Sequence, residues 1–84
     1  MIHKLYSVFD VKTQVFCKPF YAENDATALR GFTYAANDKT TDIGRWPEDY
    51  SLFFLGSFDD SDCTIVTETA PLSIAHAIAL VNKE

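Results

Sequence analysis

Few side chains in this sequence could perform covalent chemistry, and they fall in separate segments. His3 and His76 lie near opposite ends, and nothing places a base beside the Cys17 thiol, as nucleophilic catalysis would need. The phosphate-binding patterns G-x-G-x-x-G and the P-loop are missing, and so is the G-x-S-x-G of hydrolases. We therefore expect no enzyme, no catalytic residues and no cofactor. An enzyme would require His3 or His76 to meet Cys17 or a carboxylate in a pocket.

Carboxylates are the second source of chemistry. Glu48-Asp49 and Asp59-Asp60 are adjacent in sequence, and neighbouring side chains point apart, so they make poor acid–base pairs and suit solvated turns. Asp60-x-Asp62 resembles the start of a calcium loop but lacks the glycine and glutamate that this loop needs at its sixth and twelfth positions. No metal site is expected.

Basic residues interleaved with aromatic rings are typical of proteins that bind single-stranded nucleic acid. The candidates for phosphate contact and base stacking are Lys4, Tyr6, Lys18, Tyr21, Arg30, Arg45 and Trp46. The net charge of −5 opposes this reading, because phosphate contact needs positive charge, so binding would be modest and salt-sensitive. The alternative is a domain whose aromatic residues fill its core.

Charge is distributed unevenly along the chain. Residues 1–45 carry six basic and five acidic side chains, whereas residues 46–84 carry one basic and seven acidic side chains. This asymmetry fits a bipolar surface or ordinary solubilising charge. It also supports a second hypothesis, an acidic protein-interaction module that binds a basic partner.

A chain of 84 residues forms one domain, residues 1–84. So short a chain buries a smaller fraction of its surface than a larger domain does, which favours a homodimer. No membrane partner is expected, because no apolar run approaches the roughly 20 residues of a membrane span. The N-terminus lacks a signal peptide, so we expect the cytoplasm, where Cys17 and Cys63 would be free, buried thiols.

The pattern of apolar residues predicts an α+β fold. Residues 3–9 and 14–21 read as a hairpin of strands, with Pro19 at an edge or a strand end. Asn24 is a predicted N-cap for a helix over 25–37, in which Gly31 would permit close packing on the sheet. Asn37-Asp38 ends that helix, and a polar loop follows over 38–50.

The second half repeats this order. Residues 51–58 and 63–68 are predicted strands, joined by an aspartate-rich turn. Pro71 would open a final helix with an apolar stripe that includes Leu72 and Ile78. The order is then ββαββα, with two hairpins forming an antiparallel sheet packed with two helices. Trp46, in the loop before the second hairpin, is read first as a lid on the core and second as an exposed stacking group.

Several short segments resemble, in order and spacing, a small nonstructural protein of microviruses, the single-stranded DNA phages of the gokushovirus type. The resemblance covers most of the chain and is strongest over 4–60. It rests on Leu5-Tyr6-Ser7-Val8-Phe9-Asp10, Pro19-Phe20, the helix with Asn24, Ala28, Arg30 and Phe32, Asn37-Asp38, Ile43-Gly44, Pro47-Glu48-Asp49-Tyr50, Leu55-Gly56-Ser57-Phe58-Asp59-Asp60 and, more loosely, Pro71-Leu72-Ser73.

The resemblance implies a nonstructural DNA-binding or DNA-synthesis protein. Such a protein would act when phage replication switches from duplex to single-stranded genomes for packaging. It implies no catalytic residues, and it transfers no binding residues.

Overall fold

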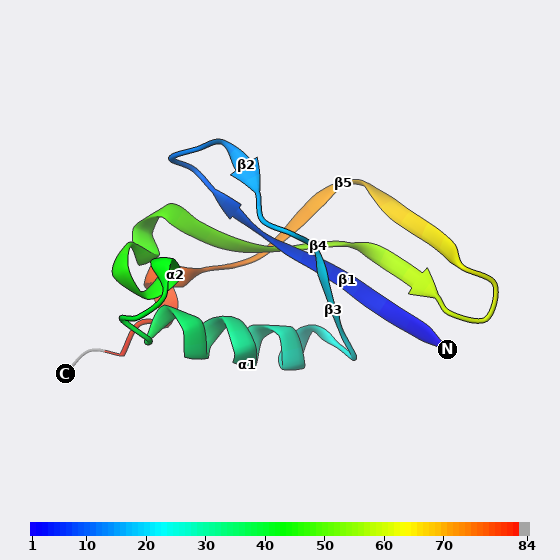
Figure 1. The fold of residues 1–84 in the computed structure, drawn as a ribbon, viewed down its shortest axis with the longest axis horizontal. Coiled ribbons are helices and arrows are strands. Elements are labelled where there is room, and N and C mark those ends of the chain that lie inside the picture. Colours follow the sequence, from blue (N-terminus) through cyan, green and yellow to red (C-terminus); the bar gives the residue numbers. More distant parts are fainter. Residues whose placement is uncertain (83–84) are drawn as a thin grey trace.

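The computed structural model, described here for residues 1–82, is a mixed α and β structure built on a five-stranded antiparallel sheet. The strands are β1 (Ile2–Asp10), β2 (Val15–Phe16), β3 (Phe20–Ala22), β4 (Tyr50–Asp59) and β5 (Thr64–His76). The helical segments are α1 (Asp25–Ala36), α2 (Asp42–Arg45) and the 3-10 helices η1 (Pro47–Asp49) and η2 (Ala77–Leu80). Helix α1 runs along one side of the sheet, and the tip of the β4–β5 hairpin projects beyond the N-terminal end of α1, at the right of Figure 1.

The sheet is organised around β1, which pairs with β4 along one edge and with both β2 and β3 along the other. The spatial order is β2-β1-β4-β5, with β3 beside β1. The predicted second strand is divided at Pro19, because proline has no N–H to donate to a ladder. The predicted strands 3–9 and 51–58 correspond to β1 and β4.

Helix α1 follows the sequence prediction closely. The Asn24 side chain accepts a hydrogen bond from the Thr27 N–H at 2.8 Å, as an N-cap should. Ala28, Phe32 and Ala36 recur at helical spacing and are buried. The predicted polar loop over 38–50 contains the short segments α2 and η1 in the structure.

The prediction of a final helix opening at Pro71 is wrong. Strand β5 continues through this segment to His76, because Leu72 and Ser73 pair with Phe54 and Phe53 of β4. Among the described residues after Pro71, only the four of η2 are helical, so the predicted order ββαββα is not observed. The homodimer that accompanied that prediction stays a prediction.

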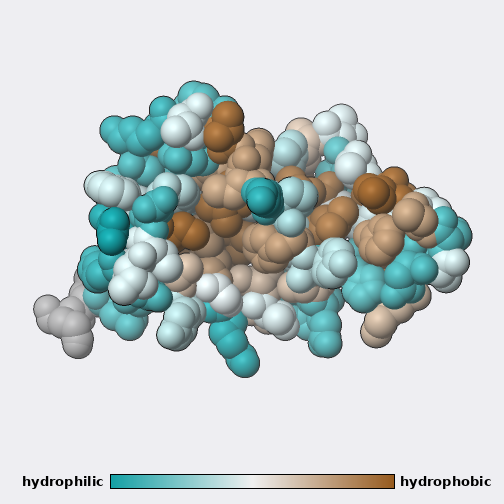
Figure 2. Space-filling view, in the orientation of Figure 1, coloured by the Kyte–Doolittle hydropathy of each residue, from teal (hydrophilic) through white to brown (hydrophobic). Residues whose placement is uncertain are grey.

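The core lies between α1 and one face of the sheet. Tyr6, Val8 and Leu52 supply its strand side, and Ala28 and Phe32 are among its helical residues. An apolar groove of about 390 Å³ opens between β3 and α1, and Figure 2 shows hydrophobic surface over the middle of the molecule. Gly31 lines this groove and has nothing within 4 Å of the position that its Cβ would take, so it does not serve close packing on the sheet.

The ladders of β4 with its two neighbours are irregular near Leu55. Leu55 is an extra residue in β4, because Leu5 pairs with Gly56 whereas Tyr6 pairs with Phe54. Opposite it, β5 carries residues 68–71 between its paired residues Thr67 and Leu72. Gly56 has a φ of +155°, and an added Cβ would lie 2.0 Å from the Val66 carbonyl oxygen, so only glycine fits there.

Candidate nucleic-acid interface

The basic residues proposed from sequence do not form one surface. Lys4 lies on β1, where it pairs with Ala22 and Ser57, and Lys18 is exposed in the loop between β2 and β3. Arg30 projects from α1, and Arg45 ends α2. The structure brings the last two toward the same end of α1 and leaves Lys4 and Lys18 outside that cluster.

A groove beside the C-terminal half of α1 is where basic and aromatic side chains meet. This α1 groove has a volume of about 770 Å³ and is lined by Ala26, Leu29, Arg30, Thr33, Tyr34, Asn37, Asp38, Lys39 and Asn82. Arg45 adjoins it, because its Nε donates a hydrogen bond to the Lys39 carbonyl oxygen at 3.1 Å. Three cationic side chains therefore lie along the groove and its margin.

The lysine and the tyrosine of this groove, Lys39 and Tyr34, were not among the sequence candidates. Lys39 donates from Nζ to the Gly44 carbonyl oxygen at 3.2 Å, which holds it over α2. Tyr34 is 76% exposed and stands one helical turn after Arg30. The spacing of Arg30 and Tyr34 on a predicted helix was a usable signal, whereas the position of Lys39 depends on the fold of the segment after α1.

The charges of the α1 groove are not neutralised internally. Within residues 1–82, no ion pair involves Arg30, Lys39 or Arg45. One carboxylate, that of Asp38, lines the groove. Its Oδ1 accepts hydrogen bonds from the Thr40 hydroxyl at 2.6 Å and the Thr40 N–H at 2.9 Å, and these bonds lower the pKa of Asp38. The groove thus combines unpaired cations with one carboxylate that is already engaged.

The three aromatic candidates have different environments. Tyr6 is fully buried in the core, so its ring offers no free face to a base. Burial, followed by a 2.6 Å hydrogen bond from its hydroxyl to Asp25 Oδ1, raises the pKa of Tyr6. Tyr21 is 60% exposed on β3, away from the basic cluster. Trp46 is 48% exposed, so it is not the lid that the sequence favoured.

Trp46 lies in an acidic setting. It lines a groove of about 450 Å³ with Asp10, Lys12, Glu48, Asp49 and Tyr50, which we call the Trp46 groove. Since the carboxylates outnumber the single lysine, this surface repels phosphate and attracts a basic partner. Arg45 is adjacent in sequence but is directed toward Lys39.

Each of the two histidines contacts one polar side chain, His76 that of Ser51 and His3 that of Asp60. Ser51 Oγ lies 2.6 Å from His76 Nδ1, yet within residues 1–82 no carboxylate bonds the second nitrogen of His76, and Ser51 is buried. Partial burial, followed by the charges of Asp10 and Asp42, raises the pKa of the Cys17 thiol, the reverse of what an activated nucleophile needs. Cys17 and Cys63 are free thiols, as expected, but both are exposed rather than buried.

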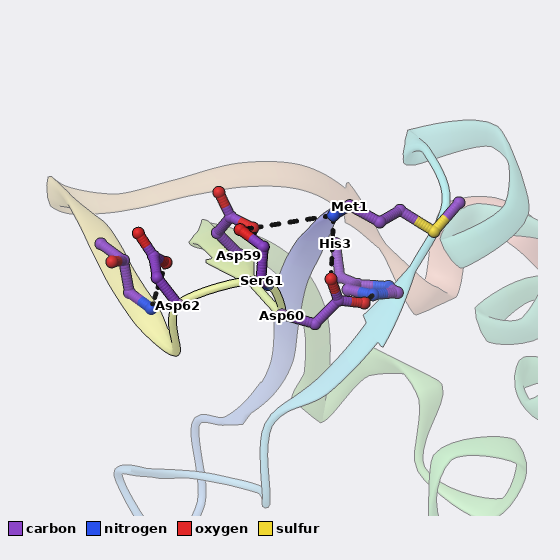
Figure 3. Close-up of polar contacts among 7 residues, drawn as sticks. Met1, His3, Asp59, Asp60, Ser61 and Asp62 are labelled. Atoms are coloured by element: carbon purple, nitrogen blue, oxygen red, sulfur yellow. Dashed lines mark hydrogen bonds and ion pairs between the residues drawn. The ribbon is translucent and has the colours of Figure 1, made fainter.

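The other histidine belongs to a polar cluster at the β4–β5 turn (Figure 3). Asp60 bonds the Met1 amino group and His3 Nε2, each at 2.8 Å. Asp59 accepts from the Ser61 hydroxyl and N–H, and Asp62 accepts from the Thr64 N–H. These bonds order the turn and tie it to the start of β1. Within residues 1–82, no three His, Cys, Asp or Glu side chains are grouped so that they could hold a metal ion.

In the described part of the chain, no helix is long and apolar enough to cross a membrane.

Comparison with curated proteins and with solved structures gives no match. A family model described as "Phage ORF5 protein" matches residues 3–80, which covers the described strands and helices apart from the first residue of β1, together with the cationic side chains of the α1 groove. The chain therefore belongs to the phage ORF5 protein family.

Proposed function

We propose that this phage protein is a non-catalytic, nonstructural protein of the microvirus type that binds single-stranded DNA in the α1 groove. It would act in the switch to single-stranded genome synthesis and packaging. The observation that carries the proposal is the meeting of Arg30, Lys39 and Arg45 with the exposed ring of Tyr34. Cations that follow a groove and an aromatic ring on which a base can stack are the two parts of a sequence-tolerant single-strand site.

The local arrangement limits the effect of the net negative charge on the α1 groove. Phosphates respond to the charge within about one Debye length, which is about 10 Å at 0.1 M salt. The acidic residues of the Trp46 groove and the β4–β5 turn belong to other surfaces. The net charge of −5 lowers affinity at long range, so binding should be weak and should depend strongly on salt.

The first experiment is fluorescence anisotropy with a labelled single-stranded oligonucleotide at roughly 50 and 200 mM salt. Three phosphate contacts predict an affinity about 20-fold lower at the higher salt. Arg30→Ala and Lys39→Ala should each weaken binding about 5- to 10-fold at the lower salt, because each removes one phosphate contact. Tyr34→Ala should weaken binding and Tyr34→Phe should retain it, since stacking needs only the ring.

Lys12→Ala is the matched control for charge. It removes the same unit of positive charge from the Trp46 groove rather than from the α1 groove. It should therefore leave oligonucleotide binding nearly unchanged. Absence of binding at the lower salt, or an equal loss in Lys12→Ala and Arg30→Ala, would contradict the proposal.

A second candidate function is an acidic protein-interaction module, favoured by the Trp46 groove. A half-exposed tryptophan among carboxylates suits a basic partner such as a replication or capsid protein, because aromatic residues anchor protein interfaces. As the single tryptophan of the chain, Trp46 reports on this surface directly by its fluorescence. Titration with an arginine-rich peptide should change its emission, and Glu48→Gln should weaken the response more than Asp62→Asn, which removes a charge from the β4–β5 turn. Equal effects of the two variants would contradict a partner in this groove.

A further inference from the structure

The sheet has one face that no helix covers in the described structure. Side chains alternate along β1, so Tyr6 and Val8 face α1 while His3 and Phe9 face away from it. Residues paired across strands share a face, which places Phe16 and Phe53 with Phe9, and Phe58 with His3. Tyr21 pairs with Leu5 and joins the same face. We call these six side chains, His3, Phe9, Phe16, Tyr21, Phe53 and Phe58, the aromatic face.

The rings of the aromatic face contact one another in two groups. Phe16 lies with its centroid 4.8 Å from Phe9 and 5.5 Å from Phe53. Tyr21 lies 5.2 Å from His3 and stacks at 6.3 Å on Phe58. None of the six belongs to the core or packs against it in the described residues. Phe16 is 43% exposed and Tyr21 is 60% exposed, so apolar area remains open to solvent here.

This face also lacks formal charge along its strands. Lys4, Asp10 and Asp59 alternate onto the other face. Charged side chains of the described residues lie at the margins of this face, where Asp60 contacts His3 and Lys18 is exposed in the loop between Phe16 and Tyr21. Without a row of cations along the strands, aromatic rings alone are a poor platform for a phosphate backbone. A two-fold interface, in contrast, places each patch against its own copy, so an uncharged patch avoids repulsion between like charges.

The exposed area of the chain leaves room for an interface of standard size. A monomer of 9.4 kDa is expected to expose about 5,000 Å². This chain exposes 5733 Å². The excess of about 700 Å² is close to the roughly 800 Å² that each partner buries in a standard protein interface.

We propose that two copies of this chain pack their aromatic faces against each other in a two-fold dimer. The occupant of the face is a second copy rather than nucleic acid or another protein. The α1 groove lies outside this interface, so the proposal is independent of DNA binding. Both copies would keep their grooves open.

Sedimentation equilibrium over roughly 1–200 µM tests the proposal. The wild type should reach twice the 9.4 kDa mass of one chain. Phe16→Lys and Tyr21→Lys should each raise the dimer dissociation constant at least about 100-fold, because each places two like charges across the two-fold axis in a desolvated interface. Tyr21→Lys alters a ring that is already 60% exposed, so it spares the fold of the monomer.

Val15→Lys is the matched control. Val15 is adjacent to Phe16 and 57% exposed, but it pairs with Asp10 and belongs to the opposite face. It adds the same charge to β2 and should leave the dimer intact. A wild type that stays monomeric at the highest concentration would overturn the proposal. So would a dimer that resists both aromatic variants, a dimer that Val15→Lys disrupts equally, or aromatic variants that abolish oligonucleotide binding while the mass is unchanged.

Discussion

Tyr6 joins the sheet to the start of α1. Its ring is fully buried between Phe20, at a centroid distance of 5.9 Å, and Phe54, at 5.6 Å in an edge-to-face arrangement. Its hydroxyl reaches the first turn of α1, where it donates to Asp25. A single side chain therefore fixes both the depth of the core and the position of the helix.

Tyr6→Phe should lower the free energy of unfolding by about 1 kcal/mol, because it removes this hydrogen bond while keeping the ring. Chemical denaturation at neutral pH measures the change. Tyr34→Phe is the control, since Tyr34 is 76% exposed and forms no hydrogen bond through its hydroxyl in the described residues, so its value should be near zero. Equal effects of the two variants would show that the bond to Asp25 adds no stability.

At the scale of single residues, local signals were the predictable part. Asn24 was identified as a cap and Pro19 as a strand end, because each acts through its own backbone. The exposure of Tyr6 and Trp46 was not predictable, because burial depends on which segments pack together. The role of Lys39 in the α1 groove was not predictable for the same reason, because only the fold of the segment after α1 brings Lys39 near Arg30.

Among the elements, α1 contains a position that could be improved. Gly31 lies inside the helix, where glycine costs about 1 kcal/mol relative to alanine, and a Cβ there would meet open space. Gly31→Ala should therefore raise the free energy of unfolding by up to about 1 kcal/mol, which corresponds to about 4–8 °C in melting temperature.

Gly44→Ala is the contrasting variant. Gly44 lies in α2, where a Cβ would stand 2.0 Å from the Asp38 carbonyl oxygen. This substitution should destabilise by at least about 2 kcal/mol, because neither backbone segment can move without breaking the α1–α2 connection. Thermal unfolding of both variants is the measurement, and a destabilised Gly31→Ala would show that the groove beside it closes on the glycine.

The last element shows where sequence patterns fail. The stripe from Leu72 to Ile78 has helical spacing, and Pro71 suits a first turn. The same residues extend a hairpin whose two strands are already paired at Phe58 and Ile65. Ladder hydrogen bonds to β4 satisfy the backbone, so tertiary pairing overrides the local preference. Strand order and register could not be read from the sequence for this reason.

At the scale of the whole molecule, Asp60 joins the tip of the β4–β5 hairpin to the start of β1 through its contacts with Met1 and His3. Hydrogen bonds from the Met1 amino group and from His3 lower the pKa of Asp60, and Asp60 in turn raises the pKa of that amino group. The carboxylate therefore stabilises the fold above the unfolded pKa of about 3.9, and this contribution is lost as the pH falls. The amino group contributes below about pH 8, and its share is lost as the pH rises.

Asp60→Asn should accordingly melt at a slightly lower temperature than the wild type at pH 6. The difference should shrink as the pH falls from about 4 toward the lowered pKa of Asp60 in the folded state, because protonation of the carboxyl removes its contribution over that range. Thermal melts across this range, at low and high salt, measure it. Asp62→Asn controls for the loss of a turn carboxylate, since Asp62 bonds only the Thr64 N–H in the described residues. A difference that stays constant with pH would contradict a charge effect.

The interruption in β5 has a consequence for aggregation. This strand forms one of the two edges of the sheet, and an exposed edge can recruit further strands into open-ended fibres. Residues 68–71 break its regular ladder, and Pro71 has no N–H to offer. Edge-to-edge growth is thereby blocked along the middle of β5. Copies of this chain at high concentration should form closed assemblies rather than fibres.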